Sequence, residues 1–127
     1  MEIKENETVN AEFDKEDIVK NKGMAVLAYL SWLVLIPFFR VRKTSKFARF
    51  HINQGLVLAI AGTVYELLTK VIIEIIVNIS VPMGVLVETI LDLCGVVFLI
   101  LHIMGIINAA RGKVKELPTF GKIRILK

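Results

Sequence analysis

The stretch GVLVETILDLCGVVFLILHIMGII, residues 84–107, decides the class of fold to which this chain belongs. Apart from Glu88, Asp92, His102 and one threonine it is apolar. As a helix rising about 1.5 Å per residue it is long enough to cross a hydrocarbon core of about 30 Å. The sequence therefore predicts a transmembrane helix over residues 84–107.

Two further apolar stretches precede this one, at residues 23–39 and 46–78. The first is barely long enough to span a bilayer, while the second, at about 50 Å as a helix, must protrude, tilt or bend. Residues 80–84 include Pro82 and predict the turn before the last helix. We therefore predict an all-α integral membrane bundle with three transmembrane helices at about 23–39, 46–78 and 84–107.

The composition supports a membrane protein and argues against a soluble domain or a nucleic-acid-binding protein. Hydrophobic residues make up 55% of the chain, well above a typical soluble domain. The net charge is +4, but most cations flank apolar stretches, where lipid headgroups are the nearer partner. The cations expected to contact headgroups are Arg40, Arg42, Lys43, Lys46, Arg49, Arg111 and Lys113.

Charge also predicts the domain plan and the orientation. Residues 1–22 are polar and acidic, which is typical of a flexible tail with room for a short helix at its end. Residues 23–127 form the membrane domain, with a basic loop at 40–49 and a basic tail at 108–127. By the positive-inside rule the loop and tail are cytoplasmic, so three spans place the N-terminus outside a bacterial inner membrane. Lys20 and Lys22 mildly favour the opposite placement.

Beyond Lys46 and Arg49 at the start of the second stretch, five charged residues fall inside the last two apolar stretches. If the turn between the two stretches centres near residue 81, two residues whose numbers sum to about 162 lie at the same depth in the membrane. The hairpin then gathers the five charged residues into one cluster. Two interpretations remain open: an interfacial cluster in which the lysine pairs locally, or a polar path or self-association surface within the membrane. The five are Glu66, Lys70, Glu74, Glu88 and Asp92.

Small residues at helical spacing predict close packing of the second and third helices. Thr44 or Ser45 can cap the second helix, and a polar group at its start predicts a specific contact there. No enzyme motif is present, and His51 and His102 lie too far apart in depth for one metal site, so we expect no enzyme activity, metal or cofactor. The packing residues are Ala59, Gly62, Gly95 and His102, and the contact at the helix start comprises Phe50, His51, Gln54 and Gly55.

Three segments carry a family resemblance: MAVLAYLSWLVLIPFF (24–39), KFARFHINQGL (46–56) and GIINAARGKVKELPTFGKIRILK (105–127). They resemble a widespread group of small bacterial membrane proteins of unknown function. That group is related to the twenty-kilodalton membrane subunit of the chloroplast inner-envelope protein-import machinery. The resemblance implies an α-helical integral membrane protein and, by analogy with chloroplasts, a link to preprotein translocation. Its most specific parts are Phe50-His51-x-x-Gln54-Gly55, Leu117-Pro118 and Gly121-Lys122-Ile123-Arg124.

The sequence thus predicts a small polytopic membrane protein whose molecular activity it does not reveal. A channel-like, translocation-related or scaffolding subunit is the first expectation, with the lipid bilayer, further copies of the chain or other membrane proteins as partners. The alternative is a holin-like pore former or a toxin-immunity membrane protein, since holins of this length can have three spans. A holin expressed alone should stop growth abruptly, which separates the two.

Overall fold

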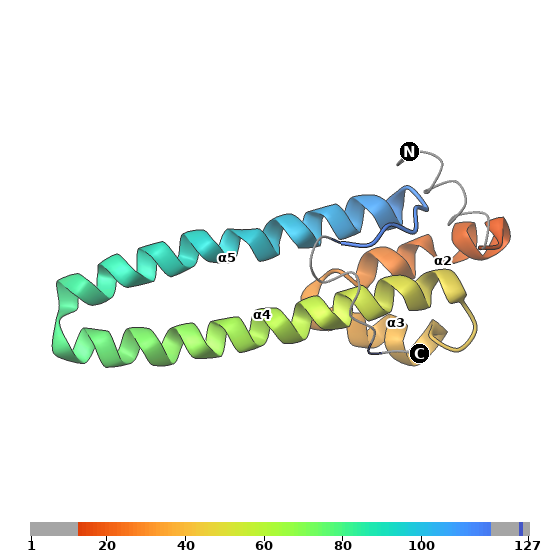
Figure 1. The fold of residues 1–127 in the computed structure, drawn as a ribbon. Coiled ribbons are helices and arrows are strands. Elements are labelled where there is room, and N and C mark those ends of the chain that lie inside the picture. The colour runs from red at the N-terminus through yellow and green to blue at the C-terminus, as the bar shows by residue number, and fades with distance from the viewer. Residues whose placement is uncertain (1–12, 118–124, 126–127) are drawn as a thin grey trace.

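The computed structural model describes residues 13–117 and Ile125, and all the elements in this part are helical. In chain order they are α2 (Lys15–Leu27), the short 3₁₀ helix η1 (Ser31–Val34), α3 (Leu35–Val41), α4 (Lys46–Ile79) and α5 (Val81–Ala110). Figure 1 shows α4 and α5 as a long hairpin, with α2 and α3 gathered at one end. This confirms the all-α prediction.

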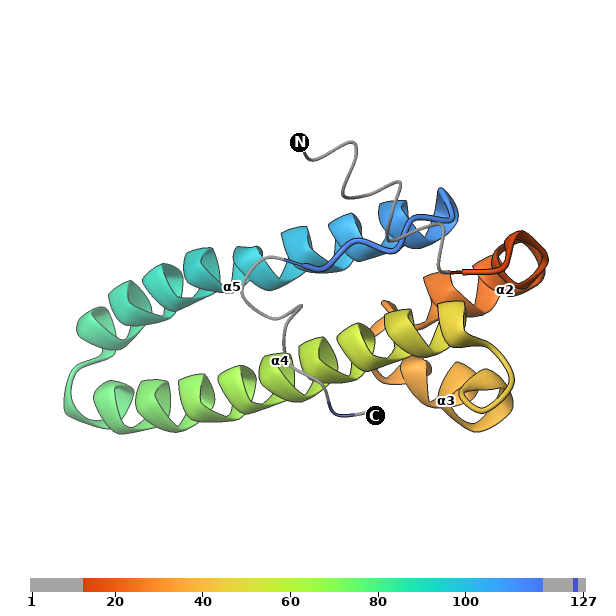
Figure 2. The same ribbon diagram turned by 45° about the vertical axis from the view of Figure 1, so that its right-hand side comes forward.

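The hairpin turns at Ser80, which ends α4 and caps α5. Ser80 has an extended backbone (φ −154°, ψ 114°), and its hydroxyl accepts a hydrogen bond from Met83 N at 3.4 Å. Pro82 follows in the first turn of α5, where the missing N–H costs no helical hydrogen bond. Both α4 and α5 are long and apolar enough to cross a membrane. We call the Ser80 end the tip and the opposite end, where α2 and α3 pack (Figure 2), the base.

The register of the hairpin is close to the predicted one. A Cβ added to Gly84 would meet Val77, one added to Gly62 would meet Phe98, and Gly95 faces Tyr65. The residue numbers of each pair sum to 160 or 161, against the predicted value of about 162. The Tyr65 hydroxyl also donates to Leu91 O, 2.5 Å away across the seam between the helices.

Residues 23–39, predicted as one transmembrane helix, do not form one. Helix α2 ends at Leu27, Ser31 adopts φ 56°, and η1 and α3 then lead to the loop before α4. A positive φ is unfavourable for a non-glycine residue and interrupts a right-handed helix. This apolar segment therefore forms a broken helical unit. In the part of the chain that the structure describes, two helices, not three, qualify as spans by length and composition.

Helix α2 begins earlier than the predicted domain boundary at residue 22. Asp14 caps it by accepting from Glu16 N at 3.1 Å, and the helix starts at Lys15. The flexible tail expected over residues 1–22 therefore does not include residues 15–22, which are helical. Residues 1–12 lie outside the described part of the chain, as do 118–124 and 126–127 of the basic tail.

The buried core lies at the base. Its apolar side chains come from α2, η1, the first half of α4, the end of α5 and the segment after it. From Ile60 to the tip, by contrast, large apolar side chains of α4 are exposed, and those of α5 are exposed from the tip as far as Ile107, with buried positions among them from Leu101 on. The main buried cluster comprises Ala25, Tyr29, Phe47, Leu58, Leu101, Ala109, Val114 and Leu117.

This arrangement removes the basis for placing the N-terminus outside the membrane. That placement depended on a crossing by residues 23–39. Instead, α2 packs against both α4 and α5 at the base. The segment after α5 reaches the same region, where Lys113 O contacts the first turns of α4.

Candidate functional site

A buried polar network joins α2, α4 and the segment after α5. The hydroxyl of Tyr29 lies 2.6 Å from Nδ1 of His51, and Nε2 of His51 lies 2.9 Å from Lys113 O. Because a carbonyl oxygen only accepts, Nε2 carries the proton that it donates. In the neutral imidazole, Nδ1 then accepts from the Tyr29 hydroxyl. One histidine thereby holds two segments distant in sequence.

Gln54, one helical turn after His51, extends the network. Its Oε1 lies 3.3 Å from the Tyr29 hydroxyl and accepts from Leu117 N, also at 3.3 Å. Neighbouring Asn53 accepts from Ile125 N at 2.6 Å. The first turns of α4 thus supply hydrogen bonds to backbone groups that follow α5.

Aromatic rings surround the His51 imidazole. The rings of Phe47, Phe50 and Tyr29 all pack edge-on, with centroids 4.9, 5.2 and 5.4 Å from that of the imidazole. His51 and Gln54 are completely buried. A buried polar pair is costly unless its hydrogen bonds are made. His51 uses both ring nitrogens and Gln54 uses Oε1, whereas Gln54 Nε2 has no hydrogen-bond partner in the described part of the chain.

Two glycines allow the helices to approach one another at this point. A Cβ on Gly55 would lie 1.9 Å from Ala28 O, and one on Gly105 would lie 2.2 Å from the Tyr29 ring. Gly55 therefore lets the end of α2 rest on α4, while Gly105 makes room on α5 for Tyr29. The contact predicted for Phe50, His51, Gln54 and Gly55 is thus the place where three helices meet.

A second polar contact fastens the start of α4 to α2. Ser45 caps α4 by accepting from Ala48 N at 3.0 Å, and its hydroxyl donates to Asp17 Oδ1 at 2.5 Å. The other oxygen of Asp17 accepts from Phe47 N at 3.2 Å. Burial alone would raise the pKa of Asp17, but hydrogen bonds from Ser45, Phe47 N and Asn21 outweigh it and hold the pKa below its usual value. An anion thus sits at the α4 N-terminus, where the helix dipole favours one.

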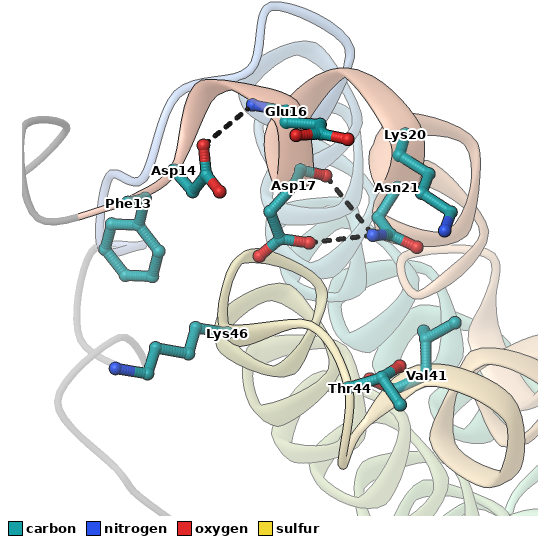
Figure 3. Close-up of a pocket in the computed structure, with 9 residues that line it drawn as sticks. All are labelled: Phe13, Asp14, Glu16, Asp17, Lys20, Asn21, Val41, Thr44 and Lys46. Carbon is teal, nitrogen blue, oxygen red and sulfur yellow. Dashed lines mark hydrogen bonds between the residues drawn. The ribbon is translucent and has the colours of Figure 1, made fainter.

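An open cleft of about 630 Å³ lies beside this contact. Figure 3 shows Asp17 directed from α2 toward the start of α4, with Asn21 bonded to its carboxylate. The walls carry both signs of charge, and Asp17 is engaged in capping, so the cleft marks the joint between α2 and α4. Its lining residues are Phe13, Asp14, Glu16, Asp17, Lys20, Asn21, Val41, Thr44 and Lys46.

The five charged residues of the hairpin lie nearer the tip, away from this network. All five are exposed, and none makes an ion pair with another residue in the described part of the chain. The local pairing of Lys70 that we considered from the sequence is therefore not formed among residues 13–117. The five are Glu66, Lys70, Glu74, Glu88 and Asp92.

The remaining predicted residues divide between the seam and the base. Ala59 is buried, Gly62 and Gly95 lie on the seam between α4 and α5, and His102 Nδ1 lies 2.6 Å from Phe98 O of its own helix. The cations predicted to meet headgroups lie in α3, in the loop after it, at the start of α4 and just after α5. Among them, the Arg42 guanidinium stacks on the Phe38 ring at 4.2 Å.

A comparison with known protein families identifies the family to which this chain belongs. The magnetosome magnetite crystal formation protein family, MamF/MmsF, matches residues 20–126. The chain belongs to the MamF/MmsF family. The match begins within α2 and includes every element that follows, so the network and the hairpin both lie inside it.

Membership of the MamF/MmsF family corrects the resemblance proposed from the sequence. No finding links the chain to the chloroplast import subunit, and the three segments that suggested it fall in the MamF/MmsF match apart from Lys127. No curated protein and no solved structure matches the chain.

Two residues of the site were missed by the sequence analysis. Tyr29 lies within the apolar stretch 23–39 that we predicted to be a span, and Asp17 lies within the acidic segment 1–22 that we predicted to be a flexible tail. A phenol within an apolar stretch signals a buried hydroxyl that needs a partner. For Asp17, no local signal distinguishes it from its acidic neighbours.

Proposed function

We propose that this chain is a membrane-embedded scaffold, not an enzyme, that takes part in magnetite crystal formation. The membership of residues 20–126 in a magnetosome magnetite crystal formation family carries the proposal. The exposed apolar hairpin supports membrane insertion, because soluble proteins rarely expose apolar patches of this extent. The polar groups of the base hold helices together, which supports a structural role.

The exposed part of the hairpin matches the thickness of a bilayer. On α4, exposed apolar residues run from Ile60 to Ile79, and on α5 from Val81 to Ile100, after which exposed Ile103 and Ile107 alternate with buried Leu101, Gly105 and Ala109. Each stretch is about 30 Å long at 1.5 Å per residue, equal to a typical hydrocarbon core. We therefore place these two stretches across the membrane and the base at one of its surfaces.

The cations assign that surface. Arg40, Lys43, Lys46, Arg111 and Lys113 are exposed at the base, while the tip around Ser80 has none. The positive-inside rule then puts the base in the cytoplasm. In this topology α2 and residues 113–117 lie on the same, cytoplasmic side, and the tip reaches the opposite side.

The exposed side chains of η1 and α3 are those expected at the membrane surface nearest the base. Trp32, Leu33 and Phe39 are exposed, and the Trp32 indole donates to Thr63 Oγ1 on α4 at 3.0 Å. Tryptophan favours the level of the headgroups, where its ring is buried and its N–H is satisfied. This unit would anchor the base to the lipid surface.

Complementation in a magnetite-forming bacterium that lacks its own family member tests the role. Expression of this chain should restore crystal size and number, measured by electron microscopy. Gly23→Ala, which meets no atom within 4 Å, should restore them equally, whereas Gly55→Leu should not because it breaks the base. A wild-type chain that inserts into the membrane but leaves the crystals unchanged would contradict the proposal.

A further inference from the structure

The charged residues of the hairpin all lie on one of its two broad faces. On α4, the seam with α5 follows Gly62, Tyr65 and Val77. At about 100° per residue, Glu66, Lys70 and Glu74 are rotated from this seam by about 40° to 120°, all in the same sense.

The acids of α5 are rotated in the matching sense. Its seam follows Gly84, Leu91 and Gly95, and Glu88 and Asp92 lie about 40° and 80° around from it. In an antiparallel helix pair, equal senses of rotation lead to the same face. We call this the charged face. It carries four acids and one lysine.

The opposite face of the hairpin is entirely apolar over the same depth. On α4 it presents Leu68, Ile72 and Ile75, and on α5 it presents Leu86, Ile90 and Val97, all of them exposed. Such a face suits lipid. Charges in hydrocarbon are unfavourable, so the charged face requires a partner that supplies opposite charge at the same depth.

We propose that the charged face binds a second copy of this chain, with Lys70 of each copy paired to the partner's Asp92. The proposal rests on the membrane placement above, and it goes beyond it by naming the surface and the occupant. Two copies inserted in the same direction are related by a two-fold axis along the membrane normal. When their charged faces meet, that axis sets α4 of one against α5 of the other.

The depths of the two residues fit this symmetry. Lys70 lies ten residues before Ser80 and Asp92 twelve after it, which puts them about 15 Å and about 18 Å from the tip. The difference is within the reach of a lysine side chain. Glu88, at about 12 Å, lies just on the other side of Lys70. A two-fold dimer thus forms two equivalent ion pairs that a single chain does not form.

Reversal of each charge gives a test that separates pairing between chains from pairing within one. Lys70→Asp and Asp92→Lys each set like charges together in a homodimer and should weaken self-association by about a hundredfold or more. A mixture of the two variants restores both pairs, so the variants should associate with each other nearly as wild type does. The control Lys115→Asp makes the same change at an exposed site after α5, away from the charged face, and should leave association unaltered.

Association is measured by energy transfer between fluorescent proteins fused to the N-terminus, in phosphatidylcholine vesicles. Insertion is measured separately by resistance to carbonate extraction, so loss of membrane placement is distinguished from loss of the dimer. If a reversed variant does not insert, the neutral pair Lys70→Gln and Asp92→Asn replaces it, and the mixture should again exceed each variant alone. A monomeric wild type, inserted single variants that still dimerise, or a mixture no better than its components would overturn the proposal.

Discussion

The hydroxyl of Tyr29 lies 2.6 Å from Nδ1 of His51, although 22 positions separate the two residues. This bond joins the end of α2 to the first turns of α4. The other imidazole nitrogen bonds Lys113 O, so the same ring also holds the segment after α5. The base of the molecule depends on this histidine and its partners.

Tyr29→Phe should therefore destabilise the protein by about 1–3 kcal/mol, because it leaves the buried Nδ1 without a donor. Thermal unfolding in detergent measures the change. Tyr65→Phe is the matched control: it also removes one hydroxyl, but that residue is only half-buried at the seam, so the loss should be smaller. Equal losses for both variants would argue against a central role for the Tyr29 bond.

Gly55→Ala should be far more disruptive than its one added methyl suggests. The new Cβ would lie 1.9 Å from Ala28 O, a backbone atom, so α2 must shift on α4. We expect the free energy of unfolding to fall by at least about 1–3 kcal/mol, the range typical of overpacked cores. Gly23→Ala, in open space within α2, should instead stabilise by about 0.5–1 kcal/mol through helix propensity. The prediction fails if both glycines tolerate alanine.

Asp17 should make stability depend on pH on the acid side. Its folded-state pKa lies below the usual value because Ser45, Phe47 N and Asn21 donate to the carboxylate and outweigh burial. The stabilisation is therefore fully present above the ordinary aspartate pKa of about 3.9 and is lost as pH falls through the folded-state pKa. Asp17→Asn should lower the free energy of unfolding at neutral pH, and this free energy should then fall less steeply with decreasing pH than in the wild type. Glu16→Gln, at an exposed neighbour, should leave the wild-type dependence on acid pH unchanged.

The hairpin could be predicted from the sequence because length and composition determine it. Residues 84–107 are apolar over a length that can cross a membrane, and the turn at Ser80 fixes the register within about one residue of the expected one. The motif at the start of α4 was also visible, since His51 and Gln54 stand one turn apart in front of an apolar stretch. The resemblance attached to that motif was wrong, because the MamF/MmsF family matches it.

The base could not be predicted, because its contacts join residues far apart in the sequence. His51 finds its partners at Tyr29 and Lys113, and nothing local to any of the three specifies the others. Residues 23–39 have the composition of a span, but Ser31 adopts φ 56° so that Tyr29 can pack against Gly105. Tertiary packing here overrides a pattern that hydropathy alone cannot distinguish from a membrane helix.

The topology of the chain tests the central claim most directly. Single cysteines replace Lys15 in α2, Met83 at the tip and Lys115 after α5, each in a Cys94→Ser background, and an impermeant thiol reagent is applied to either side of the membrane. With α4 and α5 as the only crossings, the cysteines at 15 and 115 should react from the cytoplasmic side and the one at 83 from the opposite side. Labelling of positions 15 and 115 from opposite sides would show an odd number of crossings between them and contradict the account.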